Sequence, residues 1–593
     1  MPPSESKADV SLVLCDRYKS TKPNCFDKLD IMRQRLINGQ NKRLEEWNDI
    51  NWRKATKAVK NLRQRIFRAR QLGNFRKLRN LQKLMLRSHA NLLLSIIQIT
   101  QVNTGKQTAG IDKEVINTPQ QRVKLTLDME NTAHTVKPTK RLYIPKSNGK
   151  MRPLGIPTIR DRVMQAIVKN LLEPEWEAVF EPNSYGFRPG RSCADAIDQI
   201  FNRITSKGTA KGDTWVLDAD ISGFFDNISH SQIEKSIGNT PGRKLIKMWL
   251  KSGFMDKGTF NETTQGTPQG GVISPLLANI GLHGLETAIR AIPYRDRPRK
   301  SHPKGQLNKK GMGVIRYADD FVVMANSKED ILGAKKEIEK WLEDRNLKLS
   351  EEKTKIVQVE DGFDFLGFNI RTYSEKALIK PAKTKVLQFC KNIGRVIASL
   401  SGATQETVIT KLNPILRGFA NYYRGVCSKD TFSYIRHRVW QSLWQWAKRR
   451  HPSKTETWVK DKYFHCVGTR KWVFTCKGVD GRGSEKWFKL FEVGDTPIIR
   501  HIKVKESASP DNPQLKEYWE DRRNKQGKQY WAKGSKYYQV GKNQGWKCPV
   551  CGDYLFNGED IETHHIVPVK EGGTNDTQNL VHLHKTCHKQ EHS

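Results

Sequence analysis

The sequence lacks the features of a membrane-bound or secreted protein. It has no run of about 18 apolar residues, and its longest candidate, LLLSIIQI at 92–99, is too short to span a membrane. The N-terminus, MPPSESKADVSL, has no secretory signal, and its acids argue against a transit peptide. Its 10 cysteines form no disulfide framework, and Cys466 and Cys476, near His465, are expected to be unpaired. We therefore expect a reducing cytosol and no membrane partner.

Acidic residues are few relative to basic ones. The chain carries 103 Lys and Arg against 62 Asp and Glu, a formal net charge of +41. Such a chain typically binds a polyanion, because neutralising phosphates releases the counterions condensed on nucleic acid. Residues 42–87 contain 15 basic and 3 acidic residues, and Leu78, Leu81 and Met85 follow helical spacing. This pattern predicts basic amphipathic helices that contact phosphates, with a solvated charged face as the alternative.

No internal repeat is present, and 593 residues are expected to form several domains. Short β-like runs alternate with helical stretches over 211–375, which predicts an α+β core. The pattern becomes helical over 381–450. Its apolar stripes, expected to be core, are Leu412, Ile415, Leu416, Phe419, Tyr422 and Tyr423, then Val439, Leu443 and Trp446. Residues 451–540 interleave Lys with aromatics, a composition suited to nucleic-acid contact, and SASPDNP at 507–513 is typical of a linker.

Paired acids follow two of the predicted strands. VIRYADDFVVM, at 314–324, predicts a hairpin with Asp319 and Asp320 at its turn, and WVLDAD ends another strand with Asp218 and Asp220 on one face. Carboxylates from separate strand ends can converge on Mg²⁺, which favours oxygen ligands and leaves room for substrate phosphate. Two such ions, about 3.5–4 Å apart, can serve both the attacking and the leaving oxygen of a phosphoryl transfer. A turn capped by Asp is the structural alternative.

A second cluster lies in the C-terminal tail. Cys548 and Cys551 form a CxxC pair, and His584 and Cys587 also have two residues between them. Four such ligands match a closed tetrahedral zinc site. A tail of about 48 residues is too small to build a large core, so zinc would supply folding free energy.

The order of short motifs along the chain carries a family resemblance. TAGID, RPLGIP, YGFRPGRS, DADISGFFDNI, QGTPQGGVISP, YADD, LSEEKTKIV and FLGF follow one another, and LRGFANYYRG lies at 416–425. The chain resembles a group II intron-encoded reverse transcriptase, or maturase, over nearly its whole length. The resemblance implies an α+β right-hand polymerase with fingers and an antiparallel palm sheet, a helical thumb called domain X, and a C-terminal ββα-metal HNH module. The implied domains are a basic helical extension (1–100), fingers and palm (101–375), thumb (376–450), a DNA-binding region with linker (451–540) and the HNH endonuclease (541–593).

The resemblance assigns roles in the palm. Asp220 and Asp319 would be the main ligands of two Mg²⁺ ions, with Asp320 in support. On face and position alone Asp218 competes with Asp220, but the family pattern places an aromatic five residues after the catalytic acid, which selects Asp220. That aromatic, Phe225, would lie under the incoming sugar and exclude a 2′-hydroxyl, whereas an ordinary core phenylalanine is the alternative.

Further substrate contacts are implied in the fingers and the loop that follows. Gln269 would brace the incoming nucleotide, and Gly270 with Gly271 would let the backbone approach it closely. Arg152 would clamp the triphosphate with its bidentate guanidinium. Lys146 is a second candidate for that task, and either cation could contact template phosphate instead.

The tail also resembles an HNH endonuclease through ETHHIVP, at 562–568, and the residues that follow it. His564 and His588 would bind a catalytic divalent ion, Mg²⁺ or similar. His565 would be the general base, because a neutral imidazole near pH 7 suits that role. Asn579 would orient the His565 ring, and Glu562 either supports the site or is a surface acid. A purely structural zinc finger is the alternative.

The resemblance implies a multifunctional protein that binds its intron RNA, supports splicing, nicks target DNA and copies RNA into DNA from dNTPs by target-primed reverse transcription. It would act in the bacterial cytoplasm and at the nucleoid. Three alternatives remain. One is an RNA-binding splicing cofactor with silent enzyme sites. The second is an RNA-dependent RNA polymerase, against which Phe225 argues, and the third is a retron or diversity-generating reverse transcriptase, which generally lacks the thumb and tail seen here.

Overall fold

The computed structural model describes residues 46–145, 149, 151–205, 213–294, 311–373, 376–479, 485–531, 534–556 and 559–591. The chain divides into two compact units. The first comprises residues 1–179, 225–281 and 509–593, and the second comprises 180–224 and 282–508. The division between Ala508 and Ser509 falls within the SASPDNP stretch.

The first unit begins with helices that carry the basic N-terminal sequence. Leu78, Leu81 and Met85 are buried on one face of α3, which confirms the amphipathic pattern. Arg63 of α2 donates hydrogen bonds to Glu173 and to Asp511, and this ties the segment after residue 508 to two helices. The helices are α2 (Trp52–Gln71), α3 (Phe75–Leu86), α4 (His89–Ile97), α5 (Pro119–Asn131) and α6 (Ile159–Glu177), with a π-helical turn at Gln98–Val102.

A four-stranded sheet also belongs to this unit, in the order β2-β1-β4-β5. Its long hairpin, β1 with β2, pairs Pro145 with Met151 nearest the connecting loop. The strands are β1 (Thr139–Pro145), β2 (Met151–Ile156), β4 (Phe254–Asp256) and β5 (Thr259–Asn261). Helices α9 (His230–Ile237), α10 (Arg243–Leu250) and α11 (Ser274–Gly281) lie in the same unit, and the short α8 (Phe224–Asn227) lies at its border.

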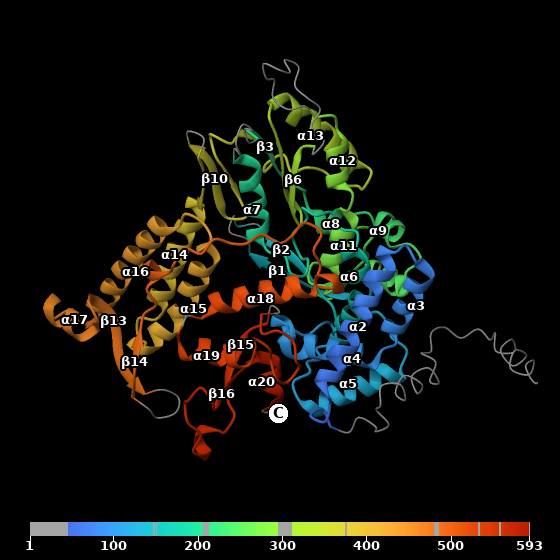
Figure 1. The fold of residues 1–593 in the computed structure, drawn as a ribbon. Coiled ribbons are helices and arrows are strands. Elements are labelled where there is room, and N and C mark those ends of the chain that lie inside the picture. The colour runs from blue at the N-terminus through green and yellow to red at the C-terminus, as the bar shows by residue number, and fades with distance from the viewer. Residues whose placement is uncertain are drawn as a thin grey trace, which may run out of the picture. The chain divides into compact units, whose positions relative to one another are not determined.

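The second unit is built on an antiparallel sheet with strand order β6-β7-β3-β8. Its central strands are apolar on both faces, because helices α7, α12 and α13 pack against the sheet (Figure 1). The strands predicted around the paired acids are confirmed. They are β3 (Trp215–Asp220), β6 (Gly313–Tyr317), β7 (Asp320–Ala325) and β8 (Lys355–Gln358), and the helices are α7 (Cys193–Ile204), α12 (Leu285–Ala291) and α13 (Lys328–Glu343).

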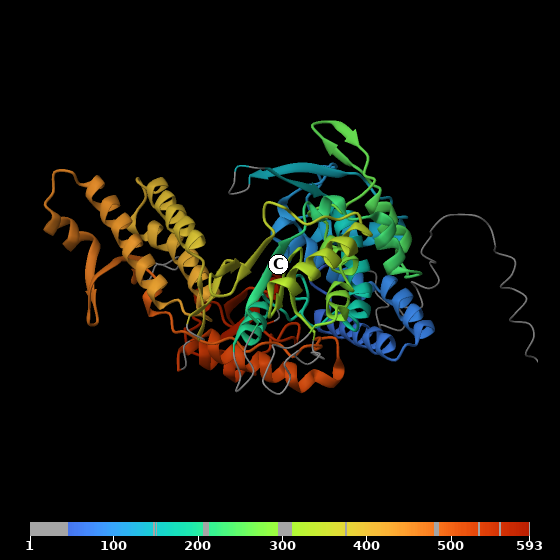
Figure 2. The same cartoon turned by 90° about the horizontal axis from the view of Figure 1, so that it is seen from above.

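A three-stranded sheet and three long helices follow in the same unit. The helices lie side by side in both views (Figure 1 and Figure 2). They are α14 (Lys383–Ser399), α15 (Gln405–Tyr423) and α16 (Lys429–Arg450), after β9 (Phe363–Phe365), β10 (Phe368–Tyr373) and β11 (Lys376–Pro381). Val439, Leu443 and Trp446 are buried as expected. The α15 stripe was predicted too wide, since Ile415 is 39% and Tyr422 45% exposed at its flanks.

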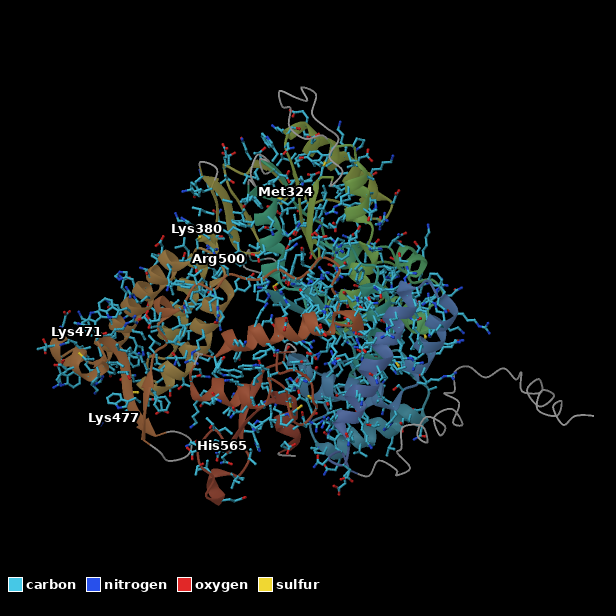
Figure 3. The ribbon with its side chains drawn as sticks, viewed as in Figure 1. Met324, Lys380, Lys471, Lys477, Arg500 and His565 are labelled. Atoms are coloured by element: carbon cyan, nitrogen blue, oxygen red, sulfur yellow. The ribbon has the colours of Figure 1, made fainter. Side chains whose placement is uncertain are left out.

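The segment after the thumb helices contains a sheet that the sequence did not predict. Helix α17 (Glu456–Tyr463) leads into the antiparallel strands β12 (Phe464–Val467), β13 (Arg470–Val479) and β14 (Glu485–Lys489). Lys471 and Lys477 lie along β13 (Figure 3). Cys466 and Cys476 are both free thiols, as expected. No helix among the described residues has the length and apolar character needed to cross a membrane.

The C-terminal module, part of the first unit, is a hairpin followed by a helix. Strand β15 (Ile561–His565) pairs antiparallel with β16 (Leu580–His584), and α20 (Lys585–Glu591) follows directly. This confirms the predicted ββα arrangement. Helices α18 (Lys516–Tyr530) and α19 (Lys536–Asn543) precede it, and the Trp531 ring stacks on His582 with centroids 4.2 Å apart. The module's packing therefore begins before residue 541.

Candidate active sites

Three carboxylates of the second unit meet where β3 and β7 run side by side. Asp220 stands directly opposite Asp320 in the antiparallel register. Opposite residues in such a ladder have Cα atoms roughly 4.5–5.5 Å apart, which brings their side chains together. Asp319 shares with Ala318 the two-residue turn that joins β6 to β7. Acids distant in the sequence therefore gather at one end of the sheet.

The turn that carries Asp319 is held in a strained conformation. Ala318 has φ +61°, a left-handed value that favours glycine, and such backbone costs about 1–3 kcal/mol at a non-glycine residue. Gly186, in the YGFRPG motif, packs against this turn. A Cβ at Gly186 would lie 2.5 Å from the Ala318 nitrogen, so only glycine allows this approach. The surrounding structure thus fixes where Asp319 stands.

The electrostatics of the cluster favour a cation. Burial, with the neighbouring Asp319 and Asp220 carboxylates, raises the pKa of Asp320 to about 7. Burial likewise raises the pKa of Asp218 to about 6. These shifts reflect the cost of holding like charges together away from water. Lys353 Nζ donates a hydrogen bond of 2.8 Å to Asp220 Oδ2 and partly offsets the charge.

The acids open onto a cleft of about 640 Å³. Asp218, Asp220 and Asp320 line it together with Lys353. The opposite lining comes from the FLGF turn and the end of α15, where Tyr422 Oη donates to the Leu366 carbonyl at 2.9 Å. The cleft therefore joins the acids to the thumb within one unit, and Mg²⁺, which prefers carboxylate oxygens, fits this donor set.

The residues expected to contact the nucleotide meet in the first unit. Arg152 Nε, on β2, donates a hydrogen bond of 2.7 Å to Gln269 Oε1. The Gly155 backbone N–H donates to the Gln269 carbonyl at 2.9 Å. Gly270 has φ +130°, and a Cβ there would lie 2.7 Å from the Gly155 oxygen. The TPQGG loop is thus fastened to the finger hairpin, whereas Lys146 lies outside the described residues.

Phe225 lies on the short helix α8 and is 8% exposed. Its carbonyl accepts a hydrogen bond of 2.6 Å from the Thr267 N–H, so the residue is connected to the start of the TPQGG loop. A Cβ at Gly266 would lie 2.6 Å from the Asp226 oxygen, which requires glycine at that contact. The candidate sugar-facing aromatic and the candidate nucleotide loop therefore form one packed element.

The four predicted zinc ligands converge in the tail. The ligand atoms of Cys548, Cys551, His584 and Cys587 all lie within 4.8 Å of one another. His584 Nδ1 lies 3.3 Å from Cys551 Sγ and 3.8 Å from Cys587 Sγ. A tetrahedral zinc ion would separate sulfur and nitrogen ligands by about 3.5 Å. The donor set and its spacing fit zinc.

The second nitrogen of His584 supports the same interpretation. Nε2 lies 2.9 Å from the Tyr554 carbonyl, a contact that fixes Nε2 as the donor and leaves Nδ1 free to bind a metal. Cys548 and Cys587 also belong to a buried cluster of the module, together with Leu555 and Leu583. Predicted metal ligands therefore make up two of the four residues of this cluster.

The predicted nuclease histidines lie on β15 and α20 of the ββα module. The rings of His564, on β15, and His588, on α20, have centroids 5.1 Å apart. Glu562 Oε2 lies 2.7 Å from His588 Nδ1, so this acid belongs to the cluster. The adjacent His565 lies at the end of β15 (Figure 3). Two imidazoles with a carboxylate behind one of them are a donor set that fits a divalent ion.

Two asparagines organise the loop beside His565. Asn575 Oδ1 lies 2.9 Å from His565 Nε2, a contact that orients the ring. Asn579 spans the loop, because its side chain donates to the Val567 and Thr574 carbonyls and accepts from the Val567 N–H. The contact expected from Asn579 thus comes from Asn575, which lies in a polar loop that offered no sequence signal.

Comparison with known families divides the chain into four successive matches. They are the N-terminal domain of reverse transcriptase (47–129), reverse transcriptase or RNA-dependent DNA polymerase (144–370), the group II intron maturase-specific domain (386–464) and HNH endonuclease (548–593). The chain is 33% identical to Protein YkfC of Escherichia coli K12, over 52% of this chain and 88% of that protein. It is 30% identical to the group II intron-encoded protein LtrA of Lactococcus lactis subsp. cremoris, over 60% and 73%.

The chain belongs to the group II intron-encoded protein family. It is a multifunctional protein that combines an RNA-directed DNA polymerase, an intron maturase domain and an HNH endonuclease. Intron RNA and other nucleic acids are its partners, and both enzyme families generally use divalent metals. Among solved structures, apo telomerase from Candida tropicalis is similar with TM-score 0.35 and 12% identity, over 54% of this chain and 58% of that one.

One residue of this group II intron-encoded protein was not singled out from the sequence. Lys353 lies in the LSEEKTKIV motif, which contributed to the family resemblance but was given no role. The structure brings its ammonium group to Asp220. No periodicity rule would have found this contact, because it joins a loop residue to a strand end across the sheet.

Proposed function

We propose that the second unit polymerises DNA on an RNA template at the cluster of Asp220, Asp319 and Asp320. The observation that carries the proposal is the β3–β7 register, which sets Asp220 opposite Asp320 beside the Asp319 turn. Asp220 and Asp319 would be the main ligands of two Mg²⁺ ions, and Asp320 would support them. When bound, the ions lower the charge on the attacking 3′-hydroxyl and the leaving pyrophosphate.

The incoming dNTP would be held by residues of the fingers and the TPQGG loop. Arg152 would clamp the triphosphate, a role also open to Lys146, and Gln269 would brace the nucleotide. The hydrogen bond between Arg152 and Gln269 supports a joint role. Phe225 would exclude a 2′-hydroxyl by steric clash, and Gly270 would allow close backbone approach.

The tail would nick one strand of a DNA target. Cys548, Cys551, His584 and Cys587 would hold a structural Zn²⁺, and His564 with His588 would hold the nuclease ion. That ion would polarise the scissile phosphate. His565 would take the proton from the attacking water at its other ring nitrogen, Nδ1, since Asn575 Oδ1 contacts Nε2. Asn579 would support catalysis by holding the loop.

These activities would act in sequence on a mobile intron. The protein would bind its intron RNA, through the basic N-terminal helices and the thumb, and stabilise the splicing-competent fold. The ribonucleoprotein would insert the intron into one DNA strand, nick the other, and extend the new 3′-end with the intron RNA as template. This is target-primed reverse transcription, and it would occur at the nucleoid in a bacterial cytoplasm.

The direct experiment purifies the protein with its flanking intron transcript and assays splicing, nicking and cDNA synthesis together. Asp319→Ala should abolish cDNA synthesis while RNA binding is retained. His565→Ala should abolish nicking while primer extension on an RNA template continues. Polymerisation that survives Asp319→Ala would contradict the palm assignment, and loss of both activities in His565→Ala would show that the sites are not separate.

A further inference from the structure

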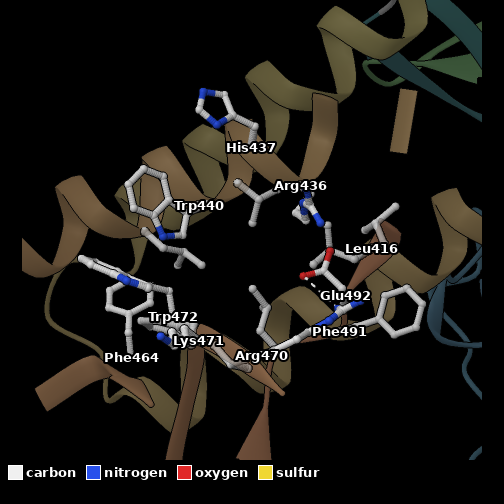
Figure 4. Close-up of a pocket in the computed structure, with 16 residues that line it drawn as sticks. Leu416, Arg436, His437, Trp440, Phe464, Arg470, Lys471, Trp472, Phe491 and Glu492 are labelled. Atoms are coloured by element: carbon white, nitrogen blue, oxygen red, sulfur yellow. Dashed lines mark ion pairs between the residues drawn. The ribbon is translucent and has the colours of Figure 1, made fainter. Parts of the chain in front are cut away.

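A pocket of about 330 Å³ lies in the second unit, between α16, the β12–β13 hairpin and the segment 490–493 that follows β14 (Figure 4). Its volume is at the lower end of the range for ligand sites, roughly 300–1,000 Å³. Buried apolar side chains, among them Val439 and Leu443, form its floor. None of the roles proposed for the polymerase or the nuclease uses this pocket.

Aromatic rings form one wall of the pocket. His437 and Trp440 lie one turn apart on α16, with ring planes 22° apart and centroids separated by 6.3 Å. Trp472 faces Trp440 edge-on at 6.1 Å, and its ring is 41% exposed. Trp472 has φ +63° inside a strand, a costly backbone conformation for a bulky residue. Strain of this kind is typical of residues held in place for a function.

Cations stand at the rim of the same pocket. Arg436 and Lys471 are exposed, and neither has an ion pair or hydrogen bond with the rest of the described chain. Arg470 pairs with Glu492 at 3.7 Å and with Asp495. Figure 4 shows Trp440 and Trp472 on one side of the hollow and Arg436 and Glu492 on the other. The pocket thus offers a stacking surface, unpaired positive charge and a wall that can both donate and accept hydrogen bonds.

From this combination we infer that the pocket binds one unpaired nucleotide of RNA. The base would stack on Trp472, and Trp440, whose ring plane is inclined by 69° to that of Trp472, would contact the edge of the base. The polar edge of the base would lie toward the Arg470–Glu492 pair. Arg436 and Lys471 would contact the flanking phosphates. Aromatic platforms beside cations are how single-stranded nucleic acid is held, and unstacked bases in loops are where proteins read RNA.

The position of the pocket favours RNA, rather than DNA, as the source of the nucleotide. His437, Trp440 and Phe464 lie within residues 386–464, which match the maturase-specific domain, and the rest of the lining, 470–474 and 490–493, lies in the segment that follows this domain. A base-paired nucleotide would not fit, because its faces are covered by its neighbours in the helix. The inference rests on the proposed RNA-binding function and adds to it a defined site for one base.

The test measures the dissociation constant of the full-length protein for a fluorescein-labelled, mixed-sequence 12-nucleotide RNA at fixed salt. Trp472→Ala should weaken binding roughly 5- to 150-fold, the range expected for loss of one stacked base, and Trp472→Phe should restore most of it. Lys471→Gln should reduce the slope of log Kd against log salt by about 1, whereas Trp472→Ala should leave the slope unchanged. The same RNA annealed to its complement should show no dependence on Trp472.

Trp487→Ala is the matched control, because Trp487 is 53% exposed on the adjacent strand β14 but does not line the pocket. Equal affinities of Trp472→Ala and Trp487→Ala would overturn the inference and leave the tryptophans as packing of the hairpin on α16. A Trp472 effect larger for the DNA oligomer of the same sequence than for RNA would also overturn it. Primer extension by the unaltered protein separates these outcomes from failure of the proposed function, which would show as no cDNA.

Discussion

The two enzymatic regions of this protein are built in opposite ways. In the palm, the ladder between β3 and β7 sets Asp220 opposite Asp320, and apolar strands and packed helices hold the sheet. In the tail, two of the four residues of one buried cluster, Cys548 and Cys587, are themselves predicted metal ligands. We therefore expect the palm to position its acids through its own packing, and the tail to need its predicted zinc to fold.

The difference follows from size and composition. A sheet covered by helices buries enough apolar surface to offset the cost of holding like charges together. The raised pKa of Asp320 reflects that cost. A short hairpin and one helix cannot bury comparable area, so ligand bonds replace apolar contacts. Changing a ligand in the palm should therefore abolish catalysis without unfolding the sheet. Changing a ligand in the tail should unfold the module.

The largest effect is expected on removing a zinc ligand. Cys551→Ser should abolish nicking and raise hydrogen exchange throughout 548–591, because structural zinc supplies about 10–16 kcal/mol in small zinc modules. Metal content measured by mass spectrometry should fall by one zinc per chain. Primer extension should remain near the unaltered level. Cys466→Ser, which changes an exposed free thiol, is the control and should retain zinc and nicking. Unchanged exchange in Cys551→Ser would show that the tail folds without its metal.

The next effect concerns the palm acids. Asp220→Asn should lower the rate of cDNA synthesis by about 10²–10³-fold or more, because an amide cannot replace a carboxylate that stabilises developing charge through a cation. Its melting temperature should not fall, since the substitution removes like-charge repulsion. Asp218→Asn, on the same strand and in the same cleft, is the matched control and should have a far smaller effect. A larger loss of cDNA synthesis in Asp218→Asn than in Asp220→Asn would show that Asp218, and not Asp220, is the catalytic acid.

A smaller effect is expected at the ring that Asn575 contacts. Asn575→Ala should reduce nicking about 10–100-fold, the range for partners that orient a functional histidine, while zinc content and hydrogen exchange stay unchanged. Asn543→Ala, an exposed asparagine on α19 of the same module, is the control. Equal nicking activity of Asn575→Ala and Asn543→Ala would favour Asn579 as the residue that orients the His565 ring.

The sequence predicted local features of the palm and the tail, but not every contact between their segments. The strand that ends at Asp220 and the hairpin with Asp319 at its turn were predicted correctly, because period-2 alternation is a local signal. The ββα arrangement of the tail was predicted from the family resemblance. The contact of Lys353 was missed because it joins the turn before β8 to the end of β3, 133 residues away in the chain. The contact of Asn575 was missed because it comes from a polar loop with no periodic pattern. The sheet β12–β14 was missed because its strands mix aromatic and basic residues without clear alternation.

Helix α15 shows a further limit of pattern analysis. Its apolar residues were expected to be core, yet Ile415 and Tyr422 are exposed at the edges of the stripe. Apolar spacing identifies the buried face of a helix but not its width, which depends on the neighbouring elements. Here the edge carries a polar contact, since Tyr422 reaches the Leu366 carbonyl at the rim of the catalytic cleft.

That contact provides the smallest and most specific prediction. Tyr422→Phe removes one hydrogen bond to the FLGF turn, worth about 0.5–1.5 kcal/mol, and keeps the ring that stacks on Phe368. We expect the KM for primer–template to rise two- to tenfold, with kcat little changed, because the turn lines the cleft but does not touch the acids. Tyr434→Phe, an exposed tyrosine on α16, is the control. A fall in kcat instead would show that the position of the palm acids depends on the thumb as well as on the β3–β7 ladder.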